Sequence, residues 1–436
     1  MQKRVLSSAI ALALTALASG TALAQSSVTI YGNIDVSVDR VKRTSGDAIT
    51  APASTGLLGA GTAAALSSAL RSQQSMTRVG PDTSSQSSLG FRGVEDLGNG
   101  YKGNFVLEGQ MGVDNGALLR DGRLFGRQAY VGLTTPFGEF RAGRQYAPIF
   151  FSSALVTTER FGSTDQFVEG GLSNNLNIRW DNALTYSLQA GGFRGQLGYS
   201  PNAGVAQKVN ALRSTSGGSD ANGQILGGIT AANENKDGRG RSLGAFGAYA
   251  ISDLTVTLGY GRTNFDNTPV VAIISGSATT LFQVDDYSVW NLGGKYVFKE
   301  LGLTLNGSFG RAAYDINGAG LPASLVGITD GKLKVSSLVL GTRYEIGAMA
   351  FLAQWSETKF RNESRGKNQA YTLGAEYSLS KRTTLYTRYE QIKDKGVGPA
   401  VTLAATGIRE VPTLAGLGIS PDGKSTQLAL GVRHNF

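Results

Sequence analysis

The chain has 436 residues and a formal net charge of +9 at pH 7, with 60 glycines, 10 prolines, one histidine and no cysteine. Hydrophobic residues make up 41% and charged residues 17%, below the roughly 45–50% and roughly 25% of globular proteins. The missing cysteines and single histidine exclude a disulfide scaffold and a zinc protein, and the near-zero mean hydropathy excludes a helical membrane protein. The glycine content is about twice the usual ~7% and needs a structural explanation.

The first 24 residues are predicted to be a signal peptide. Lys3 and Arg4 form a basic start, residues 5–18 are apolar, and Ala22 and Ala24 form a small-residue cleavage site. Residues 25–436 then form the mature domain. No later segment reaches the ~18 apolar residues of a spanning helix, so we expect a secreted protein, a periplasmic protein or an outer-membrane barrel.

Apolar and polar residues alternate along many short segments. In residues 28–38, VTIYGNIDVSV, valines and isoleucines take one parity while Thr29, Asn33 and Asp35 take the other. A period of two predicts a strand with one apolar and one polar face. The same pattern predicts sixteen strands at about 28–40, 87–95, 101–113, 124–135, 139–146, 177–190, 193–200, 242–251, 254–265, 287–298, 302–314, 332–346, 348–361, 369–379, 383–394 and 425–436.

Short turns and long polar stretches alternate between these strands. The long stretches are expected at 41–86, 147–176, 202–241, 266–286, 316–331 and 395–424. Short turns at one end and long loops at the other are typical of outer-membrane barrels. A sheet in lipid must close on itself to satisfy its backbone, and a barrel of sixteen strands encloses water. We therefore predict an all-β fold, a closed antiparallel transmembrane barrel of sixteen strands whose first and last strands pair.

Aromatic residues support this interpretation. Several lie at strand ends or on the apolar parity, as the interfacial girdles of a barrel require. They are Tyr260, Tyr296, Phe298, Tyr344, Trp355, Tyr371, Tyr377 and Tyr389.

Several segments, in order along the mature chain, resemble the general porins of Gram-negative bacteria, especially the betaproteobacterial kind. They are residues 27–32, 88–100, 124–133, 137–146, 379–384 and 431–436. The resemblance implies a homotrimer in the outer membrane, in contact with lipopolysaccharide, with short periplasmic turns and long extracellular loops. It also implies a third loop folded into the lumen as a constriction. The C-terminal Phe436 matches the aromatic residue that the barrel-assembly machinery recognises.

The resemblance also assigns residues to the pore constriction. Arg127 and Arg179 match basic residues of the wall opposite the third loop, and Arg92 matches a further basic position. Parity also points Arg92 inward, since Leu89 and Phe91 take the lipid-facing positions. Ser88 stands where the family usually has another arginine, and Pro148 begins an apolar run where many members carry an acid. The third loop spans about 147–176, and its acids are Glu159, Asp165 and Glu169. Acids facing arginines would set a field across the narrowest point of the pore.

Two further hypotheses concern charge. Arg144 falls on the apolar parity with Phe140 and Ala142, where exposure to lipid costs about 2–4 kcal/mol at the membrane midplane. We therefore predict that Arg144 is buried at a subunit interface. The net positive charge suggests a mild preference for anions through local ion enrichment.

The sequence thus predicts an outer-membrane porin for passive diffusion of ions and small hydrophilic solutes. The alternative is a barrel whose long loops serve as an adhesin or surface receptor. A barrel enzyme would need Ser, His and Asp side chains at its rim, and the lone His434 argues against both a catalytic triad and a metal site. We expect no catalytic residues, no cofactor, no metal and no nucleic-acid partner.

Overall fold

The structure is a computed structural model of the chain. It describes residues 27–44, 74–81, 83–119, 122–158, 175–204, 209–210, 240–274, 277–317, 331–361, 366–396, 413–414, 417–418 and 423–436. The predicted signal peptide lies outside the described residues, as do the acids Glu159, Asp165 and Glu169 of the third loop.

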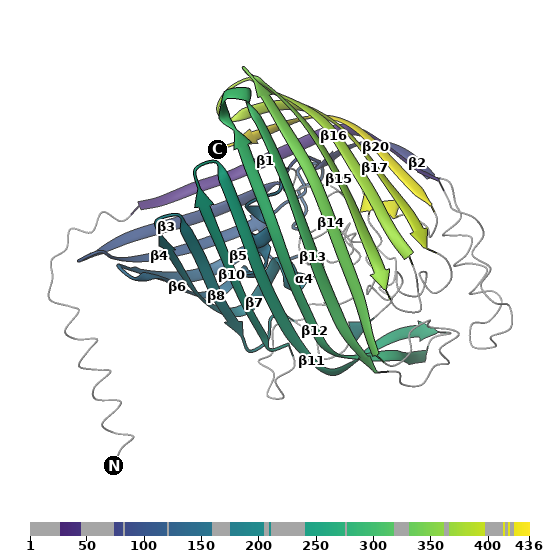
Figure 1. Ribbon diagram of the computed structural model, residues 1–436, viewed down its shortest axis with the longest axis horizontal. Coiled ribbons are helices and arrows are strands. Elements are labelled where there is room, and N and C mark those ends of the chain that lie inside the picture. The colour runs from purple at the N-terminus through teal and green to yellow at the C-terminus, as the bar shows by residue number, and fades with distance from the viewer. Residues whose placement is uncertain are drawn as a thin grey trace, which may run out of the picture.

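Strands make up nearly all of the described structure (Figure 1). The strands of the main sheet are β1 (Ser27–Thr44), β2 (Gln74–Pro81), β3 (Ser88–Gly98), β4 (Tyr101–Gln110), β5 (Gln128–Thr135), β6 (Gly138–Tyr146), β7 (Arg179–Ala190), β8 (Phe193–Ser200), β9 (Val209–Asn210), β10 (Ser242–Ile251), β11 (Leu254–Ile274), β12 (Ser277–Phe298), β13 (Leu303–Asn317), β14 (Gly331–Ile346), β15 (Met349–Arg361), β16 (Gly366–Ser378), β17 (Thr383–Gly396) and β20 (Lys424–Asn435). The other elements are α3 (Phe150–Ala154), α4 (Asn175–Ile178), η1 (Lys299–Leu301), β18 (Thr413–Leu414) and β19 (Leu417–Gly418).

The main sheet closes into a barrel. Of its 18 described strands, β2 and β9 are short additions, and the other sixteen form an antiparallel ring in chain order. The ring closes because β1 pairs with β20 from Asn33↔Asn435 to Thr44↔Lys424. The predicted fold and the pairing of the first and last strands are therefore confirmed.

The side chains alternate around this wall as predicted. On β1, Val28, Ile30 and Val38 are exposed on the outside, whereas Asp35 and Asp39 are buried on the inside. A barrel in lipid needs an apolar exterior and a polar lumen, so only half of each strand is apolar. The low hydrophobic content of the chain follows from this arrangement. No helix of the described residues is long and apolar enough to cross a membrane.

Two long connections are shorter than the sequence analysis predicts. The sequence predicts a loop at 266–286, but β11 continues to Ile274 and β12 starts at Ser277, so most of this region is hairpin. Within 41–86, β2 pairs with the second half of β1, from Val36↔Pro81 to Arg43↔Gln74. In both places the alternation is unclear, because residues 270–274 form a continuous apolar run and residues 74–81 show no regular apolar parity.

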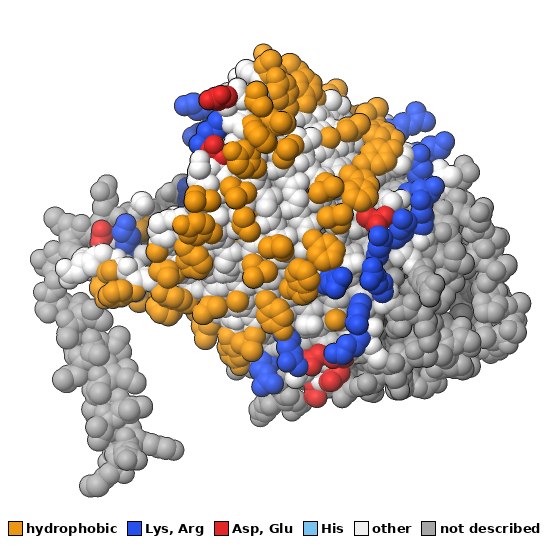
Figure 2. All heavy atoms as spheres, in the orientation of Figure 1, with side chains coloured by type: hydrophobic (Ala, Val, Ile, Leu, Met, Phe, Trp, Pro, Cys, Tyr) orange, Lys and Arg blue, Asp and Glu red, His pale blue; other side chains and the backbone are white. Residues whose placement is uncertain are grey.

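The exterior carries an apolar band bordered by basic residues (Figure 2). The predicted aromatic residues lie on the outward parity, and Tyr260, Tyr296 and Tyr344 are among the exposed ones. At the end of the barrel beside the long loops, Lys and Arg side chains follow one another along the outward face. We call this set the basic belt: Lys42, Lys332, Lys334, Lys359, Arg361, Lys367, Lys393, Lys395 and Lys424.

Candidate functional site

The first part of the third loop lies inside the barrel. Its helix α3 packs on the inner face of β10, β11 and β12. The Thr257 hydroxyl donates to the Ser152 carbonyl at 2.6 Å, and the Asn291 amide donates to Ser152 Oγ at 3.1 Å. Lys295 Nζ donates to the Leu155 carbonyl at 2.9 Å. The described part of the predicted inward third loop is thus fixed to the wall by side chains from two strands.

Glycines on the inner face make this packing possible. A Cβ at Gly259 would come within 2.7 Å of Ser152 Cβ, and one at Gly293 within 2.7 Å of Val156 Cγ2. Real Cβ atoms do not approach so closely, so only glycine fits beneath the loop. Gly198 and Gly244 play the same part beneath Trp180 and Pro148. Part of the high glycine content is explained by this close contact.

Arg127 and Arg179 converge on one tyrosine at the base of the third loop. Each guanidinium donates to the Tyr146 hydroxyl, from Arg127 Nη2 at 3.0 Å and from Arg179 Nη2 at 2.9 Å. Arg127 also forms an ion pair with Glu108. The Arg179 guanidinium lies 4.5 Å from the Tyr146 ring centre, and Phe150 stacks on the same ring at 4.4 Å.

This cluster is only slightly open to the lumen. Arg179 is 4% exposed, and the side chain of Arg127 is 12% exposed. The structure therefore brings the two predicted arginines together, but at the root of the third loop. Their role in lining the constriction stays a prediction. The partners Tyr146 and Glu108 could not be predicted from the sequence, because nothing in the spacing links residues that lie on different strands.

Arg92 lies on the inner face of β3 and is exposed. It faces Thr29 across the β1–β3 pair, and its guanidinium lies 5.1 Å from the centre of the Tyr31 ring. Arg194 on β8 is also exposed and inward, 5.9 Å from the Phe151 ring centre of α3. Neither arginine forms an ion pair within the described parts of the chain. The polar parity of residues 193–200 is the signal that could have identified Arg194.

Two further positions from the sequence analysis, Ser88 and Phe436, lie near the ends of strands. Ser88, where the resemblance would put an arginine, begins β3 on the inner face opposite Asn33 and is 7% exposed. Phe436 closes the barrel seam, because its backbone N–H and C=O both bond to Gly32 at 3.1 Å. Its recognition by the assembly machinery stays a prediction.

Arg144 is held by its own chain. It lies on the outward parity opposite Ala129, and its guanidinium pairs with Asp181 and donates to the Gly126 carbonyl at 2.8 Å. Only 13% of the Arg144 side chain is exposed. Since Asp181 of the same chain compensates the charge of Arg144, a neighbouring subunit is not needed to avoid the cost of exposing that charge to lipid. Burial at a subunit interface stays a prediction.

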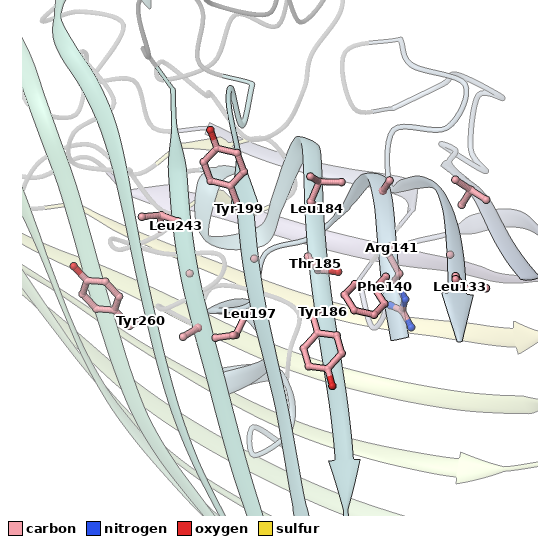
Figure 3. Close-up of a pocket in the computed structure, with 16 residues that line it drawn as sticks. Leu133, Phe140, Arg141, Leu184, Thr185, Tyr186, Leu197, Tyr199, Leu243 and Tyr260 are labelled. Atoms are coloured by element: carbon pink, nitrogen blue, oxygen red, sulfur yellow. The ribbon is translucent and has the colours of Figure 1, made fainter. Parts of the chain in front are cut away.

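A well-formed hollow lies on the outside of the barrel rather than in the lumen (Figure 3). It crosses β5, β6, β7, β8, β10 and β11, and its lining includes the exposed side chains of Leu133, Phe140, Leu184, Leu197 and Leu243. These residues belong to the apolar band, so the hollow lies on the outward face of the barrel. No group of three or more His, Cys, Asp or Glu residues that could hold a metal ion occurs in the described ranges.

A closed barrel with an apolar exterior, a polar lumen and an inward third loop defines the class of outer-membrane β-barrel channels. The chain belongs to the Gram-negative porin family, whose family model matches residues 9–397. It is an outer-membrane porin channel, and proteins of this family and fold are channels rather than enzymes.

Relatives cover nearly the whole chain. It is similar to outer membrane porin protein 32 of Delftia acidovorans, with 28% identity over 98% of this chain and 99% of that protein. It is also similar to an outer membrane porin protein of Bordetella pertussis, with 27% identity over 98% of this chain and 99% of that protein. Among solved structures, the anion-selective porin from Comamonas acidovorans matches with a TM-score of 0.62 and 24% identity, covering 94% of this chain and 100% of that one.

Proposed function

We propose that the channel passes ions and small hydrophilic solutes by passive diffusion and favours anions. The observation that carries the preference is the pair Arg92 and Arg194, which are exposed on the inner wall without an ion-pair partner among the described residues. Uncompensated positive charge in a narrow channel with low-dielectric walls raises the local anion concentration. The name of the Comamonas protein, an anion-selective porin, agrees with this proposal.

The proposed constriction combines this wall with the third loop. Arg127 and Arg179 hold the loop base through Tyr146, and Arg92 supplies open charge close by. Glu159, Asp165 and Glu169 form the acidic side of the constriction in this proposal. The described start of their loop lies inside the barrel, which supports such a placement.

Zero-current potentials in a salt gradient test the proposed selectivity. The wild-type channel is expected to favour anions, and the variant Arg92→Gln/Arg194→Gln is expected to lose about twofold or more in the anion-to-cation permeability ratio. Arg311→Gln is the matched control, because Arg311 is an exposed arginine beside an aromatic ring, Phe309, on the outward face of β13. A cation-selective wild type would refute the preference. A wild type without conductance would refute the channel and favour a surface receptor.

The same bilayer recordings test the proposed homotrimer. Conductance that appears and closes in steps of three is expected from a trimer of pores. Single independent steps would contradict it. Assembly of this trimer is proposed to use the barrel-assembly machinery, which would recognise the terminal Phe436.

The basic belt is proposed to bind phosphate groups of lipopolysaccharide. Lys367 faces Lys395 and Lys393 faces Lys424 directly across neighbouring strands, whereas Lys359 and Lys367 share Glu357 as an ion-pair partner. Like-charged pairs across strands are destabilising by themselves, so the belt is suited to an external anion. Its position between the apolar band and the long loops is the level of phosphates in the outer leaflet (Figure 2).

Binding of purified lipopolysaccharide to the refolded protein tests this partner. Replacing Lys393, Lys395 and Lys424 by Gln is expected to weaken binding about 100-fold, because three lysines at roughly 1 kcal/mol each near a charged lipid surface contribute roughly 3 kcal/mol. Replacing Lys299 and Lys381 by Gln is the control, because these exposed lysines lie at the short turns. Equal loss in both variants would show non-specific charge attraction instead.

A further inference from the structure

A short segment between β2 and β3 lies inside the barrel. Residues 83–87 read TSSQS, and we call them the inner segment. Asp35 on β1 holds them: its carboxylate accepts the backbone N–H groups of Thr83 at 3.2 Å, Ser84 at 3.2 Å and Ser85 at 2.9 Å. The Tyr386 hydroxyl donates to the same carboxylate at 2.6 Å. Asp35 is 0% exposed, so this is a buried charge whose acceptor sites are filled by the segment and the wall.

Further bonds along β1 keep the inner segment against the wall. The Ser37 and Thr83 hydroxyl oxygens lie 2.7 Å apart, and the Asn33 amide donates to the Gln86 carbonyl at 3.1 Å. The Ser87 hydroxyl donates to the Asp35 carbonyl at 3.2 Å.

Three arginine side chains from other parts of the wall also donate hydrogen bonds to the inner segment. Arg388 of β17 donates to the Thr83 carbonyl, and Arg433 of β20 donates to Ser84 Oγ at 2.8 Å. Arg127 donates to Gln86 Oε1. The inner segment has no charge of its own, so it places neutral polar groups beside these arginines, of which Arg127 also pairs with Glu108 and Arg433 with Glu376.

The inner segment and the helix α3 of the third loop contact opposite sides of the barrel wall. In the ring of strands, β1 is eight places from β11, which is halfway around the barrel. Asp35 lies near the middle of β1, and Thr257, which binds the third loop, lies on β11. The side chains of Asp35 and Thr257 both point inward from their strands.

We propose that the inner segment is a second, uncharged side of the pore's narrow zone, and that Asp35 is the positioning residue that holds it there. This inference rests on the proposed channel function and adds to it. A carboxylate is suited to this role, since hydrogen bonds to a charged acceptor are stronger than neutral ones and three successive backbone N–H groups fix the course of the chain. Release of the segment would widen the lumen.

The test uses a reversible tether. Asp35→Asn removes the charged acceptor and is expected to raise single-channel conductance roughly 1.3-fold or more, because conductance follows the free cross-section of the narrowest zone. Ser37→Cys and Thr83→Cys are added to this variant, because their side-chain oxygens are close enough for a disulfide between the replacing sulfurs. The chain has no other cysteine. Oxidation is expected to restore the wild-type conductance, and reduction to raise it again.

The tether separates this proposal from a general loosening of the barrel, because oxidation and reduction compare the same polypeptide with the inner segment held and released. If Asp35→Asn conducts as wild type, or if reduction leaves the conductance unchanged, the inference is wrong while the channel function stands.

A second measurement tests the proposal independently of whether the Asp35→Asn variant folds. Gln86→Cys in the otherwise wild-type chain places a thiol on the partly exposed part of the inner segment. A cationic, membrane-impermeant thiol reagent added to the open channel should lower its conductance and raise its anion preference, because it adds bulk and fixed positive charge to the pore wall. An unchanged current after complete modification would place the segment away from the ion path and overturn the proposal.

Discussion

Two neighbouring glycines on β12 offer a sharp test of how the third loop is seated. A Cβ at Gly293 would lie 2.7 Å from Val156 Cγ2, 2.8 Å from Thr257 Oγ1 and 3.1 Å from the Ser152 carbonyl oxygen. Ordinary carbon contacts are about 3.5–4.0 Å, so Gly293→Ala must push the loop roughly 1 Å toward the pore axis. A Cβ at Gly294 meets only the Thr255 carbonyl oxygen, at 3.9 Å. Gly294→Ala is therefore a control one residue away.

The displacement should weaken the bonds that hold the loop. The Thr257–Ser152 and Lys295–Leu155 hydrogen bonds, at 2.6 and 2.9 Å, would be stretched beyond normal length. We expect Gly293→Ala to lower the free energy of unfolding by about 1–3 kcal/mol, the usual cost of overpacking. It should also lower single-channel conductance, since the loop moves into the lumen.

Denaturant unfolding in detergent, followed by tryptophan fluorescence, and planar-bilayer recordings provide the two readouts. Gly294→Ala should match the wild type in both. If the two variants differ by less than about 0.5 kcal/mol, the scatter expected of neutral substitutions, and conduct alike, close contact beneath the loop does not explain the inner-face glycines.

Three other predictions concern the wall itself. Asp181→Asn removes the buried carboxylate that Arg144 and Arg123 share and should lower the free energy of unfolding by about 2–4 kcal/mol. Asp253→Asn breaks the pair with the exposed Lys299 and should leave the stability nearly unchanged; equal losses in denaturant titrations would contradict the burial argument. Deleting Phe436 removes two backbone bonds to Gly32 and should reduce the fraction of assembled barrel in outer-membrane preparations, and normal assembly would show that the seam closes without them. Tyr146→Phe removes the hydroxyl shared by two arginines and should increase open-channel current noise without unfolding the barrel; noise equal to that of the wild type would show that the third-loop base is fixed elsewhere.

The barrel was predictable because its two solvents lie on opposite faces of every strand. Lipid outside and water inside force an alternation that can be read from short segments such as 28–38 and 254–262. The predicted sixteen strands, the closure of β1 on β20 and the outward aromatics are all confirmed. The alternation is unclear in residues 74–81 and 270–274, so β2 and the extended hairpin of β11 and β12 could not be predicted.

The candidate site was predictable only in part. Parity alone placed Arg92 inside and Arg144 outside, because each side chain's face follows from its strand. The partners were not predictable, since Arg144 meets Asp181 and Arg127 meets Glu108 across strands that share no local pattern. The role of residues 83–87 was hidden for the same reason, as a polar Ser/Thr stretch has the composition of any surface loop.

The high glycine content shows which features the sequence determines and which depend on the tertiary structure. The sequence by itself determined that a long chain with few apolar residues spans a membrane with strands, because period-two alternation is a local property. The tertiary structure decided which glycines are required, since Gly259 and Gly293 matter only because the third loop returns to contact them. It also decided that Asp35 holds a chain segment inside the lumen, because a buried carboxylate takes its role from the groups that the fold brings to it.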